Sequence, residues 1–464
     1  MKQILSQEKL KKKLKVLPVI FALAWPTMLE QVMQTAVQYI DTAMVGSLVT
    51  FATAAVGSTA TINWLINGSV AALGVGFLAY ISQAMGAGEE ERAARAAAQA
   101  AGVVLAAGLF FTALTVALSG AVPVWMQVDA EVQKLASRYF MILYLPMLPR
   151  TASIIFGSVL RAAGDTKTPM RVSITVNAVN VLLNFLLIYA PRTALIFGRK
   201  VFLWGAGWGV TGAAIASAAS FTAGGIHITA ALWKHPLLSP GKSSLKPDRA
   251  ILAPCLRVAL PNMLQRFCTS LGYVVFAAMI NSTGGISTAA HTIANTVESA
   301  FYIPGYGMQA AAATLTGNAI GAKDRERMRS IANMIVLAEV VMMTVTGGLL
   351  FAFAPQIVSI FSAEAEVIFL GGTVLRMVAV SEPFYGVSVV TEGMLQGAGQ
   401  TKMPFLFNIL CMWGVRILGT FLCVRFLGQG LIAAWGCMIA DNMLLLLLFR
   451  LYYRCGRWNR ELFA

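Results

Sequence analysis

Long apolar runs separated by short polar connections fill most of the chain. Twelve of these runs reach the about 20 residues that a helix needs to cross the hydrocarbon core of a bilayer. They lie at residues 17–45, 52–83, 95–120, 134–158, 168–190, 206–233, 250–281, 286–317, 329–354, 369–394, 403–427 and 429–452. The pattern predicts an all-α polytopic membrane protein with twelve transmembrane helices.

The second half of the chain repeats the first at an offset of 235 residues. "LRAAGDTKTP" (160–169) matches "LQGAGQTKMP" (395–404) at six of ten positions, and "QAMGAGEEER" (83–92) matches "NAIGAKDRER" (318–327) at five. Because six helices are an even number, both halves enter the membrane from the same side, which is a parallel internal repeat. We expect two six-helix lobes, formed by residues 1–233 and 250–464 and joined by a cytoplasmic linker at 234–249.

Basic residues fall mainly in alternate connections. Six lysines lie within the first 15 residues, each even-numbered connection carries lysine or arginine, and the tail holds Arg454, Arg457 and Arg460. The odd-numbered connections carry almost none beyond Arg192, Arg199 and Lys200. By the positive-inside rule, both termini are cytoplasmic and the protein is a multi-pass protein of the plasma (inner) membrane.

Composition and charge exclude several function classes. Hydrophobic residues make up 58% of the chain and charged residues 12%, so the net charge of +15 reflects basic loops rather than a nucleic-acid partner. The chain shows no nucleotide-binding loop, zinc motif or catalytic triad. We therefore expect that the protein is not an enzyme and binds no cofactor. Its energy must then come from an ion gradient or from a partner protein.

Four polar residues form one stripe on the first predicted helix. At 3.6 residues per turn Glu30, Gln34, Gln38 and Asp41 share one face, and a carboxylate near mid-membrane is unfavourable by about 3 kcal/mol unless it faces a bundle interior or a water-filled cavity. Asp41 has no obvious basic partner, and the repeat places Phe276 at the matching position. Asp41 is therefore the strongest candidate for binding a driving ion.

The fifth helix carries a second stripe of Asn177, Asn180 and Asn184, at a depth that Asp41 shares. A carboxylate with amide oxygens supplies hard ligands for Na⁺ or a hydrogen-bonded acid for H⁺. Asp41 is then a metal ligand only if Na⁺ is the coupling ion. The alternative is that the asparagines simply join helices through amide hydrogen bonds.

Further polar side chains lie within the predicted spans and are weaker candidates for a cavity lining or a substrate site. Structural ion pairs are the favoured alternative for the acids among them, because Arg266 and Arg416 occur at similar depth. These candidates are Asn63, Asn67, Gln265, Glu298, Tyr302 and Glu382.

Several motifs, in this order and spacing, resemble the multidrug and toxic compound extrusion (MATE) family over essentially the whole chain. They are "DTAMVG" (41–46), "QAMGAG" (83–88), "GNAIGAKD" (317–324), "LRAAGDTKTP" and "LQGAGQTKMP". The resemblance implies a V-shaped pair of lobes that exports small organic, often cationic or amphipathic, compounds across the bilayer in exchange for Na⁺ or H⁺. It also implies a coupling site at Asp41, Asn180 and Asn184. Family members with a sodium site in the second lobe have a seventh-helix glutamate, which this chain lacks.

Two other functions remain open. A lipid-linked oligosaccharide flippase of the same superfamily is expected to have a more basic cavity than Glu30, Asp41, Glu298 and Glu382 indicate. A channel or a non-transporting membrane scaffold is the second alternative, and a channel shows neither counter-ion exchange nor saturation.

Overall fold

The helices of the computed structural model follow the apolar runs of the sequence. The structure describes residues 16–46, 60–125, 130–196, 199–242 and 246–456. The first half contains α2 (Leu17–Gly46), α4 (Ala60–Gly86), α5 (Glu90–Leu118), α6 (Ala121–Trp125), α7 (Ala130–Tyr144), α8 (Met147–Ala162), α9 (Lys167–Leu187) and α10 (Gly209–Trp233). The second half contains α11 (Arg249–Asn281), α12 (Gly285–Phe301), α13 (Ile303–Gly321), α14 (Arg325–Phe361), α15 (Ala365–Gly397), α16 (Lys402–Cys411), the π-helical turn η2 (Met412–Ile417), α17 (Leu418–Arg425) and α18 (Leu431–Cys455). A short 3₁₀ turn, η1 (Pro240–Lys242), lies between the halves.

The described helices account for the twelve predicted spans. Nine of them are individually long and apolar enough to cross a membrane, and the bent pair α7 and α8 makes a tenth. The remaining two predicted spans correspond to α2 and to α12 followed directly by α13. Residues 52–59, which the sequence assigns to the second span, lie outside the described residues. The predicted all-helical membrane fold is confirmed.

Two predicted spans are interrupted at or next to a proline residue. The fourth span bends by 50° between α7 and α8, and Pro146 is the residue that precedes α8. The eighth span breaks at Tyr302, where Pro304 follows in the first turn of α13. Proline has no backbone N–H to continue a helical ladder, which explains both breaks.

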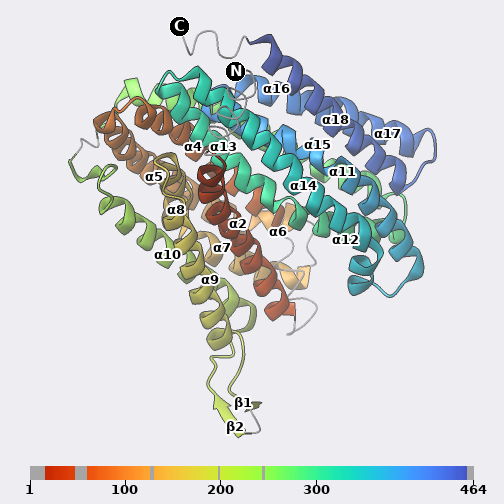
Figure 1. Cartoon of the computed structure of the whole chain (residues 1–464). Helices are drawn as coiled ribbons and strands as arrows, with labels where there is room; N and C mark the ends of the chain where they lie inside the picture. Colours follow the sequence, from red (N-terminus) through yellow and green to blue (C-terminus); the bar gives the residue numbers. More distant parts are fainter. Residues whose placement is uncertain (1–15, 47–59, 126–129, 197–198, 243–245, 457–464) are drawn as a thin grey trace.

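A β-hairpin lies in the connection between the fifth and sixth spans, where the sequence analysis expected no strands. Strands β1 (Arg192–Ile196) and β2 (Arg199–Leu203) pair antiparallel, with Arg192 opposite Leu203 and Ile196 opposite Arg199. In Figure 1 the hairpin extends beyond α9 and α10, away from the end where α2 begins and α18 ends.

The two halves of the repeat meet where α4 crosses α13. Gly317 is the repeat counterpart of Ser82, and a Cβ built on it would lie 1.9 Å from the Ser82 hydroxyl oxygen. A Cβ on Gly86 would lie 2.0 Å from the Asn318 carbonyl oxygen, and one on its counterpart Gly321 would lie 1.9 Å from the carbonyl oxygen of Gln83. The same contact thus occurs twice with the halves exchanged, so a two-fold pseudo-axis passes between α4 and α13. Only glycine permits this close approach.

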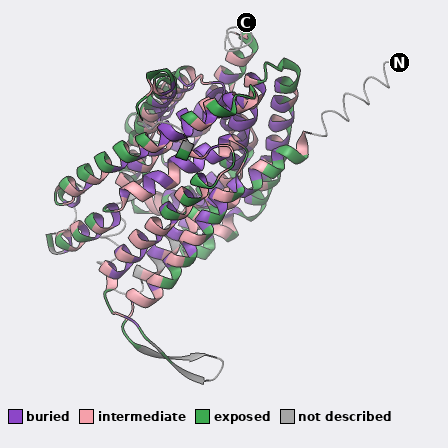
Figure 2. Ribbon diagram, turned by 90° about the vertical axis from the view of Figure 1, so that its left-hand side faces the viewer, coloured by how far each residue is buried: buried purple, intermediate pink, exposed green. Residues whose placement is uncertain are grey.

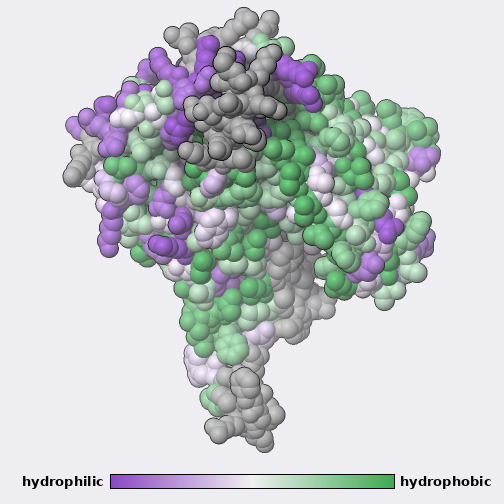
Figure 3. Space-filling model, in the orientation of Figure 1, coloured by the Kyte–Doolittle hydropathy of each residue, from purple (hydrophilic) through white to green (hydrophobic). Residues whose placement is uncertain are grey.

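Two of the three larger hydrophobic cores include helices of both halves. One lies mainly among α4, α5, α7, α8 and α10 and includes Ile251 and Cys255 of α11, and another lies around α13, α14 and α15 and includes Ile20 and Ala24 of α2. The third lies around α12, α14, α15 and α18. Figure 2 shows that buried residues face the inside of the helix layers and exposed residues lie along their outer sides. In Figure 3 hydrophobic residues cover much of the helical surface, and hydrophilic residues gather toward the end near the start of α2. The helices of the two halves diverge from that end into two arms (Figure 1).

Candidate functional site

A closed ring of hydrogen bonds surrounds Asp41 near the end of α2. The Asp41 Oδ1 atom accepts a 2.6 Å bond from Asn184 Nδ2, and Oδ2 accepts a 2.6 Å bond from the Ser217 hydroxyl. Asn184 Nδ2 also donates to Asn180 Oδ1 at 3.0 Å, and Asn180 Nδ2 donates to Ser217 Oγ at 3.1 Å. The structure therefore brings Asp41, Asn180 and Asn184 together and adds Ser217, which the sequence analysis did not single out.

Three helices position this ring, which we call the Asp41 ring (Asp41, Asn180, Asn184 and Ser217). The asparagine stripe of α9 faces inward, and its first member, Asn177, lies outside the ring. The Asn177 amide donates to the backbone oxygen of Met33 on α2 at 3.0 Å and to that of Ser173 at 2.9 Å. This contact ties α9 to α2. Ser217 comes from α10, a helix rich in Gly, Ala and Ser, whose small residues allow close approach between helices.

The Asp41 ring is buried and has no basic partner among the residues that the structure describes. Asp41 is 7% exposed, and Asn180 and Asn184 are fully buried. Among the described residues, none of the ion pairs within 4.0 Å involves Asp41. The negative charge of Asp41 is therefore stabilised by hydrogen-bond donors alone, which offset part of the unfavourable desolvation of a buried carboxylate.

The oxygens of the Asp41 ring suit a single small cation. The Asn184 Oδ1 atom is buried without a hydrogen-bond partner, and it joins the Asp41 carboxylate and the Asn180 Oδ1 atom in the same cluster. Hard oxygen ligands bind Na⁺, and a hydrogen-bonded carboxylate binds H⁺. Within the described part of the chain, no group of three or more His, Cys, Asp or Glu side chains is arranged to hold a metal ion.

Glu30, at the start of the first stripe, forms an ion pair that the sequence analysis did not predict. The Arg161 Nη1 atom lies 2.8 Å from Glu30 Oε2, and Gln34 Nε2 donates to Glu30 Oε1 at 3.3 Å. Arg161 was expected in a cytoplasmic connection, but it lies in the last turn of α8 and its long side chain reaches Glu30. The Arg161 backbone oxygen also accepts a bond from Thr314 of α13 at 3.2 Å. The side chain of Gln38 lies outside the described residues.

Asn63 and Asn67 belong to a separate polar cluster around Arg150. Asn63 Oδ1 accepts bonds from Arg150 Nη2 at 2.7 Å, from the Tyr144 hydroxyl at 2.9 Å and from Asn67 Nδ2 at 3.1 Å. The Arg150 guanidinium also lies over the Phe221 ring, 4.4 Å from its centroid. Asn63 therefore joins α4 to α7 and α8, whereas the Asn67 amide bonds to Asn63 within α4.

Three buried glutamates lie together in the second half. Glu298 accepts a 2.5 Å bond from the Tyr302 hydroxyl, and the Tyr302 ring packs against Tyr385 with centroids 4.5 Å apart. Glu382 of α15 and Glu339 of α14 are fully buried, and none of their carboxylate oxygens has a hydrogen-bond partner. Glu339, which the sequence analysis missed, stands alone in the apolar run "IVLAEVVMM", and that isolation was the available signal.

The remaining candidate, Gln265, contacts another acid that the sequence analysis missed. Gln265 Nε2 and Gln396 Nε2 each donate to Glu392 Oε1 at 3.0 Å. Arg416 instead forms its ion pair with Asp441 of α18, at 2.6 Å. Glu298 and Glu382 have no such partner within 4.0 Å among the described residues.

Comparisons with known proteins identify the family. The MatE family model matches residues 26–186 and 261–422, one segment in each half. "Probable multidrug resistance protein NorM" of Thermotoga maritima is 26% identical over 442 residues, covering 95% of this chain and 93% of that protein. "Probable multidrug resistance protein YpnP" of Bacillus subtilis is 27% identical over 452 residues and covers 96% of each chain.

Solved structures share the fold over nearly the whole chain. One titled as the outward-facing conformation of a multidrug resistance MATE family transporter superposes with a TM-score of 0.84 at 23% identity, covering 94% of this chain and 95% of that one. A transporter of the MOP superfamily from Pyrococcus furiosus, whose title reports a reversed polarity of the binding pocket, also gives a TM-score of 0.84, at 24% identity and the same coverage. The family model covers well over half of the chain and both halves of its repeat, and the chain therefore belongs to the MatE family of multi-pass membrane transporters.

Proposed function

We propose that this protein is a secondary active antiporter that exports organic, often cationic or amphipathic, compounds in exchange for H⁺ or Na⁺. The names of its relatives as multidrug resistance proteins support export of such compounds. The observation that carries the proposal is the Asp41 ring, a buried carboxylate with hydrogen-bond donors and, in the described part of the chain, no basic partner. The driving ion binds at Asp41.

Binding of a cation at Asp41 changes the hydrogen bonds that hold three helices together. Ionised Asp41 accepts one bond from α9 and one from α10. A protonated carboxyl group must donate one hydrogen bond, so at least one of these donors has to turn away or exchange its role. Na⁺ needs oxygen lone pairs, so it likewise displaces N–H and O–H groups from the carboxylate. Ion binding thus alters the packing of α2 against α9 and α10, which links it to alternating access.

The second half offers groups suited to a cationic substrate. Glu298, Tyr302 and Tyr385 combine a carboxylate with two aromatic rings that pack at a tilt of 36°. Organic cations bind carboxylates and aromatic faces. We therefore assign these residues as substrate contacts, with Glu382 nearby, rather than as a second site for the driving ion.

The protein is oriented in the inner membrane with both termini in the cytoplasm. Hydrophilic residues gather at the end of the molecule where α2 begins and α18 ends (Figures 1 and 3). This placement agrees with the positive-inside rule, which puts short basic connections in the cytoplasm.

Transport in proteoliposomes tests the proposal. Ethidium efflux is measured under separately imposed H⁺ and Na⁺ gradients for the wild-type protein and for Asp41→Asn. Substitution by Asn keeps the shape but removes the ionisable group, so ion-driven efflux should fall by at least about tenfold while ethidium binding is retained. Glu91→Gln makes the same chemical change at an exposed position in the first turn of α5 and should retain ion-driven efflux.

The same measurement separates the alternatives. Efflux by Asp41→Asn at the wild-type rate under either gradient contradicts the assignment of Asp41. Non-saturating ethidium flux without counter-ion movement indicates a channel. Absence of ethidium transport, together with gradient-independent movement of a pyrophosphate-linked lipid, indicates a flippase.

A further inference from the structure

Arg266 of α11 lies inside a membrane span and has no ion-pair partner among the described residues. No carboxylate oxygen of these residues lies within 4.0 Å of it, and its Nε atom is buried without a hydrogen-bond partner. The residue as a whole is only half-buried, and its two terminal nitrogens are not among the buried atoms. An arginine within a membrane span is unfavourable unless it is paired or faces a water-filled space. Arg266 therefore indicates a place where an anionic group can bind.

Arg266 lies where a helix of the second half packs against a helix of the first. A Cβ built on Gly68 of α4 would lie 3.5 Å from Arg266 Cβ and 3.6 Å from its Cδ, and in the described part of the chain it would meet no other atom within 4 Å. The repeat counterpart of Arg266 is Gln31 of α2, so the charge is not a feature that both halves share. The guanidinium is thus placed at the boundary between the two halves.

Glu392 of α15, the acid whose carboxylate the charge of Arg266 influences, is already supplied with amide donors. Its Oε1 atom accepts bonds from Gln265 and Gln396, both at 3.0 Å. Its Oε2 atom accepts a 3.4 Å bond from Asn408. Glu392 thus partly balances the charge of Arg266 from a distance and leaves the guanidinium fork open to another anion.

Tyr306 of α13 links Arg266 with Glu298, the acid assigned above to the cationic group of a substrate. The charges of Arg266 and Glu298 both act on the Tyr306 hydroxyl, so the two groups lie on either hand of one side chain. The charge of Arg416 also acts on Glu298, but Arg416 is paired with Asp441 at 2.6 Å. Arg266 is therefore the unpaired cation of this region.

The exposed surface of Tyr306 faces the inside of the molecule. Tyr306 is 40% exposed, although α13 packs against α2, α4, α14 and α15. The residues beside it face two of these helices, because a Cβ on Gly305 would lie 2.5 Å from a side chain of α14 and one on Gly307 would lie 2.3 Å from a side chain of α2. Tyr306 points to the remaining side, where Tyr385 of α15 and Tyr273 of α11 interact with it. Aromatic rings of three helices thus line one space.

We propose that Arg266 binds the carboxylate of a zwitterionic organic substrate whose cationic group contacts Glu298. This inference rests on the proposed export function and specifies its substrates. A guanidinium fork matches a carboxylate, and the nearby charge of Glu392 favours a singly charged anion over a phosphate monoester. The rings of Tyr306 and Tyr385 offer an apolar surface to the aromatic body of such a molecule.

Two dyes of nearly the same shape test the proposal. Rhodamine 110 carries a carboxylate and a positive charge, whereas rhodamine 123 is its methyl ester and carries the positive charge alone. Binding of each dye to the purified full-length protein in nanodiscs is measured by fluorescence anisotropy, with protein-free nanodiscs as the blank. Arg266→Gln should weaken binding of rhodamine 110 by at least about tenfold and leave that of rhodamine 123 within about twofold, because only the former loses a charge-assisted hydrogen bond.

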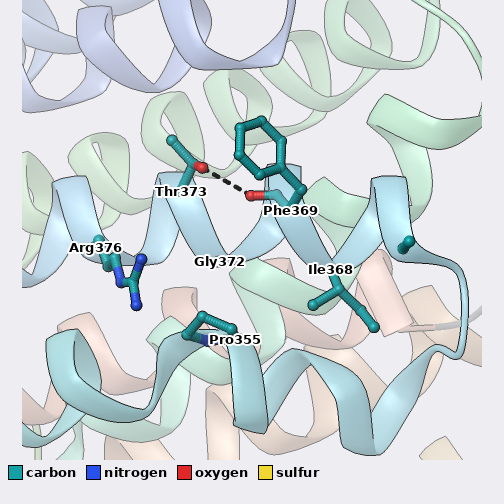
Figure 4. Close-up of a pocket in the computed structure, with 7 residues that line it drawn as sticks. Pro355, Ile368, Phe369, Gly372, Thr373 and Arg376 are labelled. Carbon is teal, nitrogen blue, oxygen red and sulfur yellow. Dashed lines mark hydrogen bonds between the residues drawn. The ribbon is translucent and has the colours of Figure 1, made fainter.

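Arg376→Gln is the matched control. Arg376 of α15 also has no carboxylate oxygen within 4.0 Å among the described residues. It lies beside Pro355 in a small pocket between α14 and α15, more than two helical turns before Tyr385 (Figure 4). This variant should bind both dyes like the wild type. Glu298→Gln removes the partner of the positive charge and should weaken the binding of both dyes.

A second variant covers Arg266 without removing it. The Cβ of Gly68→Leu would meet only Arg266, so the leucine side chain can be accommodated beside the stem of the arginine. It should weaken the binding of rhodamine 110 more than that of rhodamine 123.

Three results would overturn the proposal. The first is undiminished binding of rhodamine 110 by a folded Arg266→Gln protein, and the second is an equal loss of both dyes by that protein. The third is a wild-type protein that binds no rhodamine 110. If circular dichroism shows that Arg266→Gln is unfolded, Gly68→Leu decides, and undiminished binding of rhodamine 110 by that variant rejects the site. No ion gradient is imposed in these measurements, so their failure is distinct from a failure of ion-driven ethidium efflux.

Discussion

The Ser217 hydroxyl donates a 2.6 Å hydrogen bond to the Asp41 carboxylate from a helix that lies 176 residues further along the chain. With the bond from Asn184, it gives each carboxylate oxygen one donor. The two donors come from two helices, α9 and α10. In the proposed mechanism, loss of either donor alters the balance of Asp41 between its ionised and its cation-bound form.

Ser217→Ala should reduce gradient-driven efflux by about tenfold. A hydrogen bond to a charged group contributes about 1.5–3 kcal/mol, and each 1.4 kcal/mol corresponds to a factor of ten. Ser220→Ala is the control, because the Ser220 hydroxyl donates to the Ser217 backbone oxygen rather than to Asp41. Initial rates of ethidium efflux in proteoliposomes check this, and equal rates for both variants would show that the Ser217 bond does not contribute to coupling.

Arg161→Gln should destabilise the protein by about 3 kcal/mol, because it leaves the buried Glu30 carboxylate without its cation. The double variant Glu30→Gln with Arg161→Gln removes both charges and should recover most of this loss. Thermal unfolding in detergent of the two single variants and the double variant gives the coupling energy. A strictly additive double variant would mean that the ion pair does not stabilise the fold.

Cys455 should react with a membrane-impermeant maleimide from the cytoplasmic side only. It is the last residue of α18 and is exposed, whereas the other five cysteines are buried or half-buried. Inside-out vesicles should therefore be labelled and intact cells should not, with Cys455→Ser as the control. Labelling of intact cells would reverse the proposed orientation.

His235, in the connection after α10, should make stability fall as the medium becomes acidic. Its Nδ1 atom accepts bonds from the backbone N–H groups of Leu237 and Leu238, at 3.3 and 3.2 Å. Burial lowers the pKa of His235 below its usual 6.5, although the charge of Asp165 opposes the shift. The unfolded chain therefore binds a proton that the folded chain resists, so stability is unaffected above about pH 6.5 and declines below it.

His235→Gln removes this titration and should give a shallower loss of the unfolding temperature between about pH 7 and pH 5. Leu237→Ala, which leaves His235 and both backbone donors in place, is the control. Identical pH profiles for His235→Gln and the wild-type protein would contradict the expected role of the histidine.

Hydropathy and the internal repeat were sufficient to predict the membrane fold. Twelve apolar runs and two matches at one offset define helices and their symmetry without reference to tertiary contacts. The hairpin at 192–203 was missed because a short connection between apolar runs carries too weak a signal to separate a strand pair from a loop. The bend before α8 was missed because a proline is compatible with either a kink or a break.

The Asp41 ring could be predicted only in part. The spacing of Asn177, Asn180 and Asn184 places them on one helix face. Their position along the helix then predicts the same depth in the membrane as Asp41. Ser217 could not be predicted in this way. It is one of several small residues in α10, and only its tertiary contact with Asp41 distinguishes it from them. The interaction of Arg161 was missed for a related reason. Position along a helix gives the depth of the Cα atom, whereas the charged end of a long side chain can lie about a helical turn away from it.

The contact between Ser82 and Gly317 bears on how the two halves can move. Both residues lie beside the pseudo-two-fold axis, so a swing of one arm against the other about this crossing displaces them least and the distant ends of α10 and α12 most. The two helices must stay in close contact at such a pivot, and any side chain added at Gly317 would clash with Ser82 and push them apart. In the proposed alternating-access cycle, glycine at this position thus lets the two arms rotate about a very close contact, so that a small rotation there becomes a large opening at the far surface.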